Sequence, residues 1–186
     1  MDEPNTQQHQ AVTISVERMI RFCYLSQMEV EYVRFDTKVL PLHLTRFGAM
    51  IFETASFLYS LFDDTNQATN LLKIWKGFDH PFNDELISFA EKLEPFKDEL
   101  RKVRNRIGFH GSLTRSHEKA GLGIFDVNSQ RAREFARLVR EMQNIALKMI
   151  KWYTDGMNES DRPRELWQEF MIELRGYRVE RRESIA

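Results

Sequence analysis

The sequence predicts an all-α protein, an up-and-down bundle of four or five helices. Three observations favour this fold class. Apolar residues recur at alternating three- and four-residue steps in several stretches, as in amphipathic helices that face a core. Only eight Gly and five Pro occur among 186 residues, which favours long helices with short connections. Strand signals are weak, and the stretch 121–127 (GLGIFDV) is short and isolated.

The N-terminal part of the chain is expected to contain two long helices. The first covers residues 12–35 and follows a polar stretch, 1–10, that is expected to be flexible. We interpret its single Cys23 as a small core residue. The second helix begins after Pro41 and ends near Asp63–Asp64. Its apolar face consists of Phe47, Met50, Thr54, Phe57 and Leu61.

The strongest periodic signal lies between residues 86 and 107. Pro95 interrupts it, so the sequence predicts a kink, or two helices nearly in line. Gly108 marks the expected end of this helix. The apolar positions are Leu86, Phe89, Leu93, Phe96, Leu100, Val103 and Ile107.

A second clear pattern spans residues 135–152, with Asn128 or Ser129 as the expected N-cap and Gly156 at the end. Short helices are expected after Asn66 and after Pro163. The last residues, 178–186, form a charged tail that we expect to be frayed. The length fits one domain, 1–186.

Composition excludes several classes of function. The formal net charge of −1 gives no global basic field, so any contact with RNA must rest on a local patch. One cysteine permits neither an intrachain disulfide nor a cysteine-based zinc site. We see no signal peptide and no apolar run of the roughly 20 residues that a membrane span needs. We therefore expect a cytoplasmic protein without membrane contact, and no cofactor or metal.

The segment 101–112 carries the side chains with the most useful chemistry. Arg104 and Asn105 lie at the end of the most regular predicted helix, and His110 follows in the expected turn. Gly108 and Gly111 flank His110 and would let a ligand or another backbone come close. The sequence thus brings a permanent cation, an amide and an imidazole to one helix end.

These groups suit the cleavage of an RNA phosphodiester without a metal. The ribose 2′-hydroxyl can attack its own 3′-phosphate once a base removes its proton, and histidine can do so near neutral pH. An arginine fork can hold two oxygens of the charged transition state. The product would carry a 2′,3′-cyclic phosphate.

The stretch RNRIGFH at 104–110 resembles the Arg-x4–6-His signature of the HEPN superfamily (higher eukaryote and prokaryote nucleotide-binding domains). Members of that family are four- or five-helix bundles in which this motif ends a core helix. The resemblance covers residues 40–155. It is strongest to the branch associated with abortive infection and toxin–antitoxin systems, where an upstream helix ends in Leu-Phe-Asp, as in 61–63 here.

The resemblance implies roles for particular residues. Arg104 and His110 would be catalytic, Asn105 would help to orient them, and Asp63 would support the pair. HEPN proteins commonly form homodimers in which two Arg/His pairs face one cleft, and this doubles the local positive charge. The resemblance implies an RNase toxin or phage-defence effector with a cognate antitoxin protein as a further partner. The basic patch for RNA would include Arg101, Lys102, Arg106 and Arg115.

Two other interpretations stay open. The chain could be a non-catalytic HEPN module that binds a nucleotide, RNA or a protein, or a structural bundle without a ligand. Arg104 would then be a cation at a helix C-terminus, His110 a capping or core residue, and Asp63 part of a solvated helix end. The sequence lacks the Glu-x-x-His pairs of di-iron bundles, the His-Glu-x-x-His zinc motif, the phosphate-binding Gly-rich loop and the Gly-x-Ser-x-Gly elbow.

Overall fold

The computed structural model describes residues 3–35, 52–63, 70–107, 129–156 and 163–172, and their side chains except those of 3–8, 28–35 and 106–107. All regular secondary structure in these ranges is helical, which confirms the predicted all-α class. Two helical segments cover 52–59 and 163–172. The other elements are α1 (Glu3–Phe35), α3 (Leu71–Lys76), α4 (Asn83–Leu93), the 3-10 turn η1 (Glu94–Phe96), α5 (Lys97–Lys102), the π-helical turn η2 (Val103–Ile107) and α8 (Gln130–Asp155).

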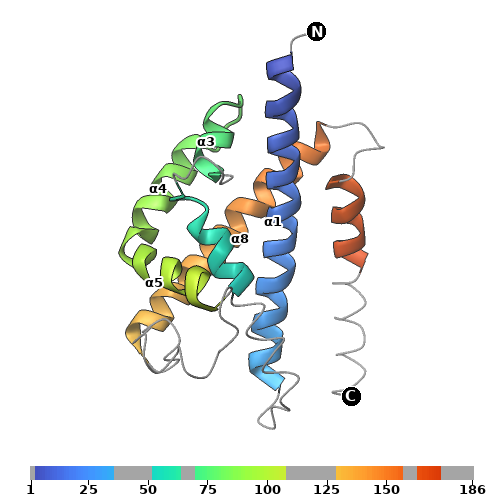
Figure 1. Ribbon diagram of the computed structural model, residues 1–186. Coiled ribbons are helices and arrows are strands. Elements are labelled where there is room, and N and C mark those ends of the chain that lie inside the picture. The colour runs from blue at the N-terminus through green and yellow to red at the C-terminus, as the bar shows by residue number, and fades with distance from the viewer. Residues whose placement is uncertain (1–2, 36–51, 64–69, 108–128, 157–162, 173–186) are drawn as a thin grey trace.

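The bundle is organised around α1 and α8, which cross obliquely and make the most extensive helix–helix contact (Figure 1). On one side of this pair, α3 packs on α1, and α4 packs on both α3 and α8. The segment 163–172 runs along the other side of α1 (Figure 1). None of the described helices is both long enough and apolar enough to cross a membrane.

Helix α1 begins at Glu3, well before the predicted start at residue 12. The apolar pattern marks only the part that packs, whereas a nucleated helix can extend into a polar stretch. Two side-chain hydrogen bonds join α1 to its neighbours. Trp75 Nε1 on α3 donates to Ser15 Oγ at 2.9 Å, and Gln143 Nε2 on α8 donates to Ser26 Oγ at 2.5 Å. Cys23 on α1 is buried, as predicted.

The predicted break at Pro95 is confirmed. Helix α4 ends at Leu93, the 3-10 turn η1 contains Pro95, and α5 continues from Lys97. Proline lacks an amide hydrogen and clashes with the preceding turn, so the regular ladder cannot pass through it. The side chains of Leu86, Phe89, Leu93, Phe96, Leu100 and Val103 are all buried in one core.

Helix α8 begins at the predicted cap. Ser129 Oγ accepts a hydrogen bond from the Ala132 amide at 3.0 Å, so Ser129 and not Asn128 is the N-cap. Arg131 anchors this end to the break in the preceding helix. It forms an ion pair with Glu99 and places its guanidinium 4.3 Å from the centre of the Phe96 ring.

The two short helices also follow the residues after which the sequence predicts them. Helix α3 begins after Asn70, whose side chain accepts from the Lys73 amide, and the segment 163–172 starts at Pro163. The predicted helix before Asp63 is described from residue 52 onward. Its expected start after Pro41, the stretch 121–127 and the tail 178–186 lie outside the described residues.

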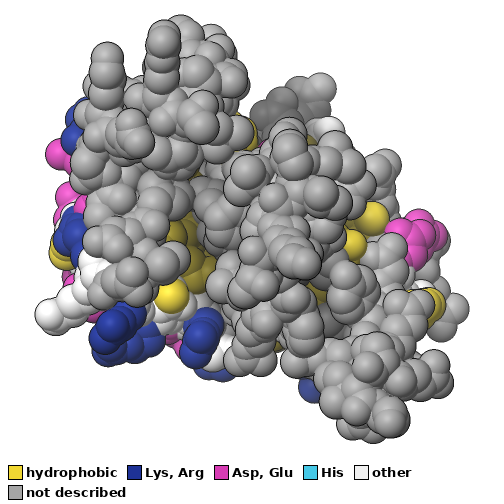
Figure 2. All heavy atoms as spheres, turned by 90° about the horizontal axis from the view of Figure 1, so that it is seen from below, with side chains coloured by type: hydrophobic (Ala, Val, Ile, Leu, Met, Phe, Trp, Pro, Cys, Tyr) yellow, Lys and Arg dark blue, Asp and Glu magenta, His cyan; other side chains and the backbone are white. Residues whose placement is uncertain are grey.

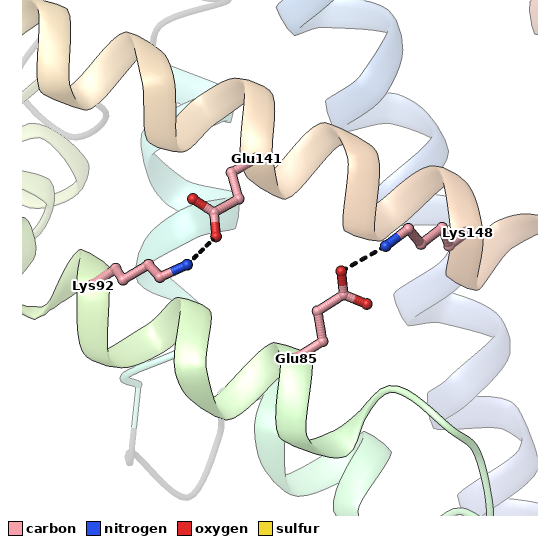
Figure 3. Close-up of polar contacts among 4 residues, drawn as sticks. All are labelled: Glu85, Lys92, Glu141 and Lys148. Atoms are coloured by element: carbon pink, nitrogen blue, oxygen red, sulfur yellow. Dashed lines mark hydrogen bonds and ion pairs between the residues drawn. The ribbon is translucent and has the colours of Figure 1, made fainter.

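Two ion pairs join α4 to α8 on the outer surface of the bundle (Figure 3). Lys92 Nζ lies 2.5 Å from Glu141 Oε1, and Lys148 Nζ lies 2.7 Å from Glu85 Oε1. Each side chain is at least 39% exposed, so each pair is expected to contribute at most about 1 kcal/mol to stability.

Candidate functional site

Arg104 lies in the π-helical turn η2 that follows α5. Its neighbour Val103 is completely buried in the core and holds the turn in place. The Arg104 side chain is 36% exposed, so its guanidinium lies at the boundary between the core and solvent. A π-turn is an irregular feature that recurs at functional sites because it displaces side chains from the regular helical phase.

The carboxylate of Asp63 fixes the position of Arg104. Asp63 Oδ2 accepts a short hydrogen bond from Arg104 Nη1, and the Asp63 side chain is only 5% exposed. The alternative interpretation of Asp63 as a solvated helix end is therefore wrong. The chain around Asp63 is itself held, because Asn70 Nδ2 donates to the Asp63 carbonyl at 3.1 Å and the Leu71 amide donates to the Ser60 carbonyl at 3.1 Å.

Tyr59 forms a second support for the guanidinium. Arg104 Cζ lies 5.2 Å from the centre of the Tyr59 ring, within the range of a cation–π interaction. Tyr59 and Asp63 are four residues apart at the end of the helical segment 52–59 and the turn that follows, so both can reach the same partner. Arg104 is thus restrained by a charge and by an aromatic ring.

The other predicted site residues are described to different extents. Asn105 follows Arg104 in η2 and is exposed. His110 and Arg115 lie outside the described residues, as does the side chain of Arg106. The structure therefore brings together Arg104 and Asp63 and leaves the position of His110 as a prediction.

The two remaining basic residues of the predicted patch lie on α5. Arg101 is exposed and forms an ion pair with Asp98 at 3.0 Å, and Lys102 is half-buried. Figure 2 shows the lower end of the molecule, where Lys and Arg side chains border a patch of apolar atoms. Arg101 and Lys102 are thus adjacent on α5, and the other members of the predicted basic patch lie outside the described side chains.

A further basic group on α1 lies near Arg104 and was not predicted. Arg18 is half-buried, and its guanidinium lies 6.0 Å from the centre of the Phe57 ring. Burial lowers the pKa of Arg18, and the charges of Arg104 and Arg21 lower it further, whereas Glu53 opposes the shift. Arg18 and Arg21 are three residues apart on one helix face, which is the signal that could have pointed to them.

Comparison of the chain with known protein families, with curated proteins and with solved structures finds no match. What the site can do is therefore inferred from its own residues. A guanidinium that is held in place at the edge of the core, beside an exposed amide, is suited to binding an anion.

Proposed function

We propose that the protein is a metal-independent endoribonuclease of the HEPN type, acting as a toxin or phage-defence effector in the cytoplasm. The observation that supports this most directly is the restraint of Arg104 by buried Asp63 and by the Tyr59 ring. Asn105 is exposed next to Arg104, and the sequence places Gly108 and His110 shortly after them. A cation positioned before any substrate arrives stabilises a charged transition state without reorganisation at the moment of reaction.

In the proposed reaction, His110 takes the proton from the ribose 2′-hydroxyl as the 2′-oxygen attacks the adjacent phosphorus. The bond to the 5′-oxygen of the next nucleotide breaks, that oxygen takes a proton from water, and the hydroxide left behind takes the proton from His110. The products are a 2′,3′-cyclic phosphate and a free 5′-hydroxyl. A guanidinium has five N–H donors, so the bond to Asp63 leaves donors with which Arg104 can hold phosphate oxygens.

The partners follow from the same proposal. The substrate is RNA, contacted by Arg101, Lys102, Arg106 and Arg115. A homodimer would place two such sites in one cleft, and a cognate antitoxin protein would restrain the activity. The charge of the whole chain is too small to attract RNA without a local concentration of basic side chains.

The test is RNA cleavage by the purified protein in excess EDTA, with the product ends analysed. His110→Ala should lower the rate by at least about 100-fold because the general base is lost. Arg104→Lys should lower it by a similar factor, since lysine keeps the charge but lacks the fork. The matched control is His9→Ala, a histidine on α1 outside the site. Circular dichroism should show that all variants are folded.

Each result has a clear meaning. Cleavage that survives EDTA, leaves cyclic phosphate ends and disappears in His110→Ala supports the proposal. Absence of cleavage by folded wild type favours the non-catalytic HEPN module that binds a nucleotide, RNA or a protein. Equal cleavage by wild type and His110→Ala rejects the assigned site.

A further inference from the structure

A small pocket opens between α1 and the segment 52–59, close to Arg104. Helix α1 contributes two arginines and two apolar side chains, and the segment 52–59 contributes a carboxylate and an aromatic ring. The cavity volume is about 30 Å³, which corresponds to only a few water molecules. The pocket therefore admits a compact group and excludes a nucleobase. Its lining residues are Arg18, Arg21, Phe22, Leu25, Glu53 and Phe57.

The electrostatics of the pocket favour an anion. Among the neighbouring charges Glu53 acts most strongly on Arg18, and the positive charges of Arg104 and Arg21 act on it with the opposite sign. Arg18 is half-buried, which weakens the screening of these interactions by water. Among the residues that line the pocket, Arg18 and Arg21 carry two positive charges and Glu53 carries one negative charge. An anion in the pocket would relieve the repulsion between the guanidinium groups.

The walls are also rigid. Phe22 and Phe57 stack with their ring centres 4.4 Å apart and are both buried. The Phe57 ring supports Arg18, and on the same helical segment the Tyr59 ring supports Arg104. The segment 52–59 therefore contacts both Arg18 from α1 and Arg104 from η2, and so sets the distance between these two arginines. A polymer with regularly spaced charges could engage both at once.

We propose that this pocket binds a backbone phosphate of the RNA strand, next to the phosphate that Arg104 contacts. This inference rests on the proposed function, because it assigns a second contact to the same substrate. Arginine forks match phosphate oxygens, and the small size of the pocket fits a phosphodiester better than a base or a sugar. Glu53 limits the affinity for the strand by repelling its phosphates.

The test measures binding separately from cleavage. A fluorescein-labelled 2′-O-methyl RNA oligonucleotide cannot be cleaved by attack of the 2′-hydroxyl, and its binding to the full chain is followed by fluorescence anisotropy across a range of salt concentrations. Arg21→Ala should weaken binding about 5- to 10-fold and reduce the salt slope by about 0.7. Glu53→Gln should tighten binding about 3-fold or more, since it removes a negative charge. Arg21 and Glu53 are exposed, so neither change should unfold the protein.

The matched control is Arg140→Ala, an exposed arginine on α8 that changes the net charge equally. It should alter the dissociation constant less than 2-fold. Equal effects of Arg21→Ala and Arg140→Ala would overturn the inference, as would failure of the wild type to bind the oligonucleotide. Arg21-dependent binding of inorganic phosphate without binding of the oligonucleotide would also overturn it. Specific binding by a protein that never cleaves RNA would reject the proposed enzyme and keep the phosphate subsite.

Discussion

Replacing Arg104 by alanine should lower the free energy of unfolding by about 2–4 kcal/mol. The lost hydrogen bond to Asp63 joins two charged groups and contributes about 1.5–3 kcal/mol. The lost contact with the Tyr59 ring adds about 0.5–1 kcal/mol. Asp63 is 5% exposed but Arg104 is 36% exposed, so the loss should not exceed the roughly 3–5 kcal/mol of a fully buried pair.

A double-mutant cycle isolates the interaction itself. We would measure urea unfolding by far-ultraviolet circular dichroism for Arg104→Ala, Asp63→Ala and the double variant. The coupling energy should be at least about 1.5 kcal/mol, because each single change removes the same hydrogen bond. The exposed pair Lys92–Glu141, treated in the same way, should give less than about 0.5 kcal/mol.

Equal coupling energies for the two pairs would refute the idea that Asp63 fixes Arg104. The cycle also has a functional counterpart if the protein cleaves RNA. Asp63→Ala should then lower the cleavage rate through the loss of Arg104 positioning, and Asp63→Asn should restore part of it, since the asparagine oxygen can still accept a hydrogen bond from Arg104. A purely structural role would lower the cleavage rate only as far as each variant loses stability, which the unfolding curves measure.

Three further predictions concern the bundle. Ser129→Ala should lower the free energy of unfolding by about 1 kcal/mol through loss of the bond to the Ala132 amide, and an unchanged urea midpoint would contradict this. Burial raises the pKa of Cys23 to about 12, so a thiol reagent should label it far more slowly in the native protein than in urea; equal rates would show an accessible thiol. Burial also lowers the pKa of His80, against the raising effects of its hydrogen bonds and of Asp79. The folded state then binds fewer protons at His80 than the unfolded state, so the contribution of His80 to stability should be constant above about pH 6.5 and fall as the pH drops below it. Urea unfolding against pH, compared with His80→Asn, checks this, and the same pH dependence in the variant would place its origin elsewhere.

The sequence was sufficient to predict most of the bundle because its helices are amphipathic and have strong local signals. Pro95 marked the break between α4 and α5, and Ser129 capped α8. The start of α1 was predicted too late, since the residues after Glu3 carry no apolar pattern that would reveal helix. The periodic spacing of apolar residues indicates which face of a helix packs on a core, and a polar extension of the helix has no such face.

The site was predictable only where its residues form a local motif. Arg104 and Asn105 were found because they adjoin in sequence, and Asp63 entered through the resemblance of 61–63 to a family pattern. The support from Tyr59 depends on a contact between residues far apart in the chain, which no local pattern encodes. Arg18 differs in part, because its spacing from Arg21 on α1 is a local signal, whereas its proximity to Arg104 follows only from the packing of α1 beside the segment 52–59.

The two ion pairs between α4 and α8 have opposite polarity along the helices. Lys92 faces Glu141, whereas about two turns away Glu85 faces Lys148 (Figure 3). If α8 slid along α4 by two turns in one direction, Lys148 would meet Lys92. Sliding the other way would bring Glu141 to Glu85. Both alternatives place like charges together, which is unfavourable. Surface charges that add little to stability thus help to select one alignment of the helices.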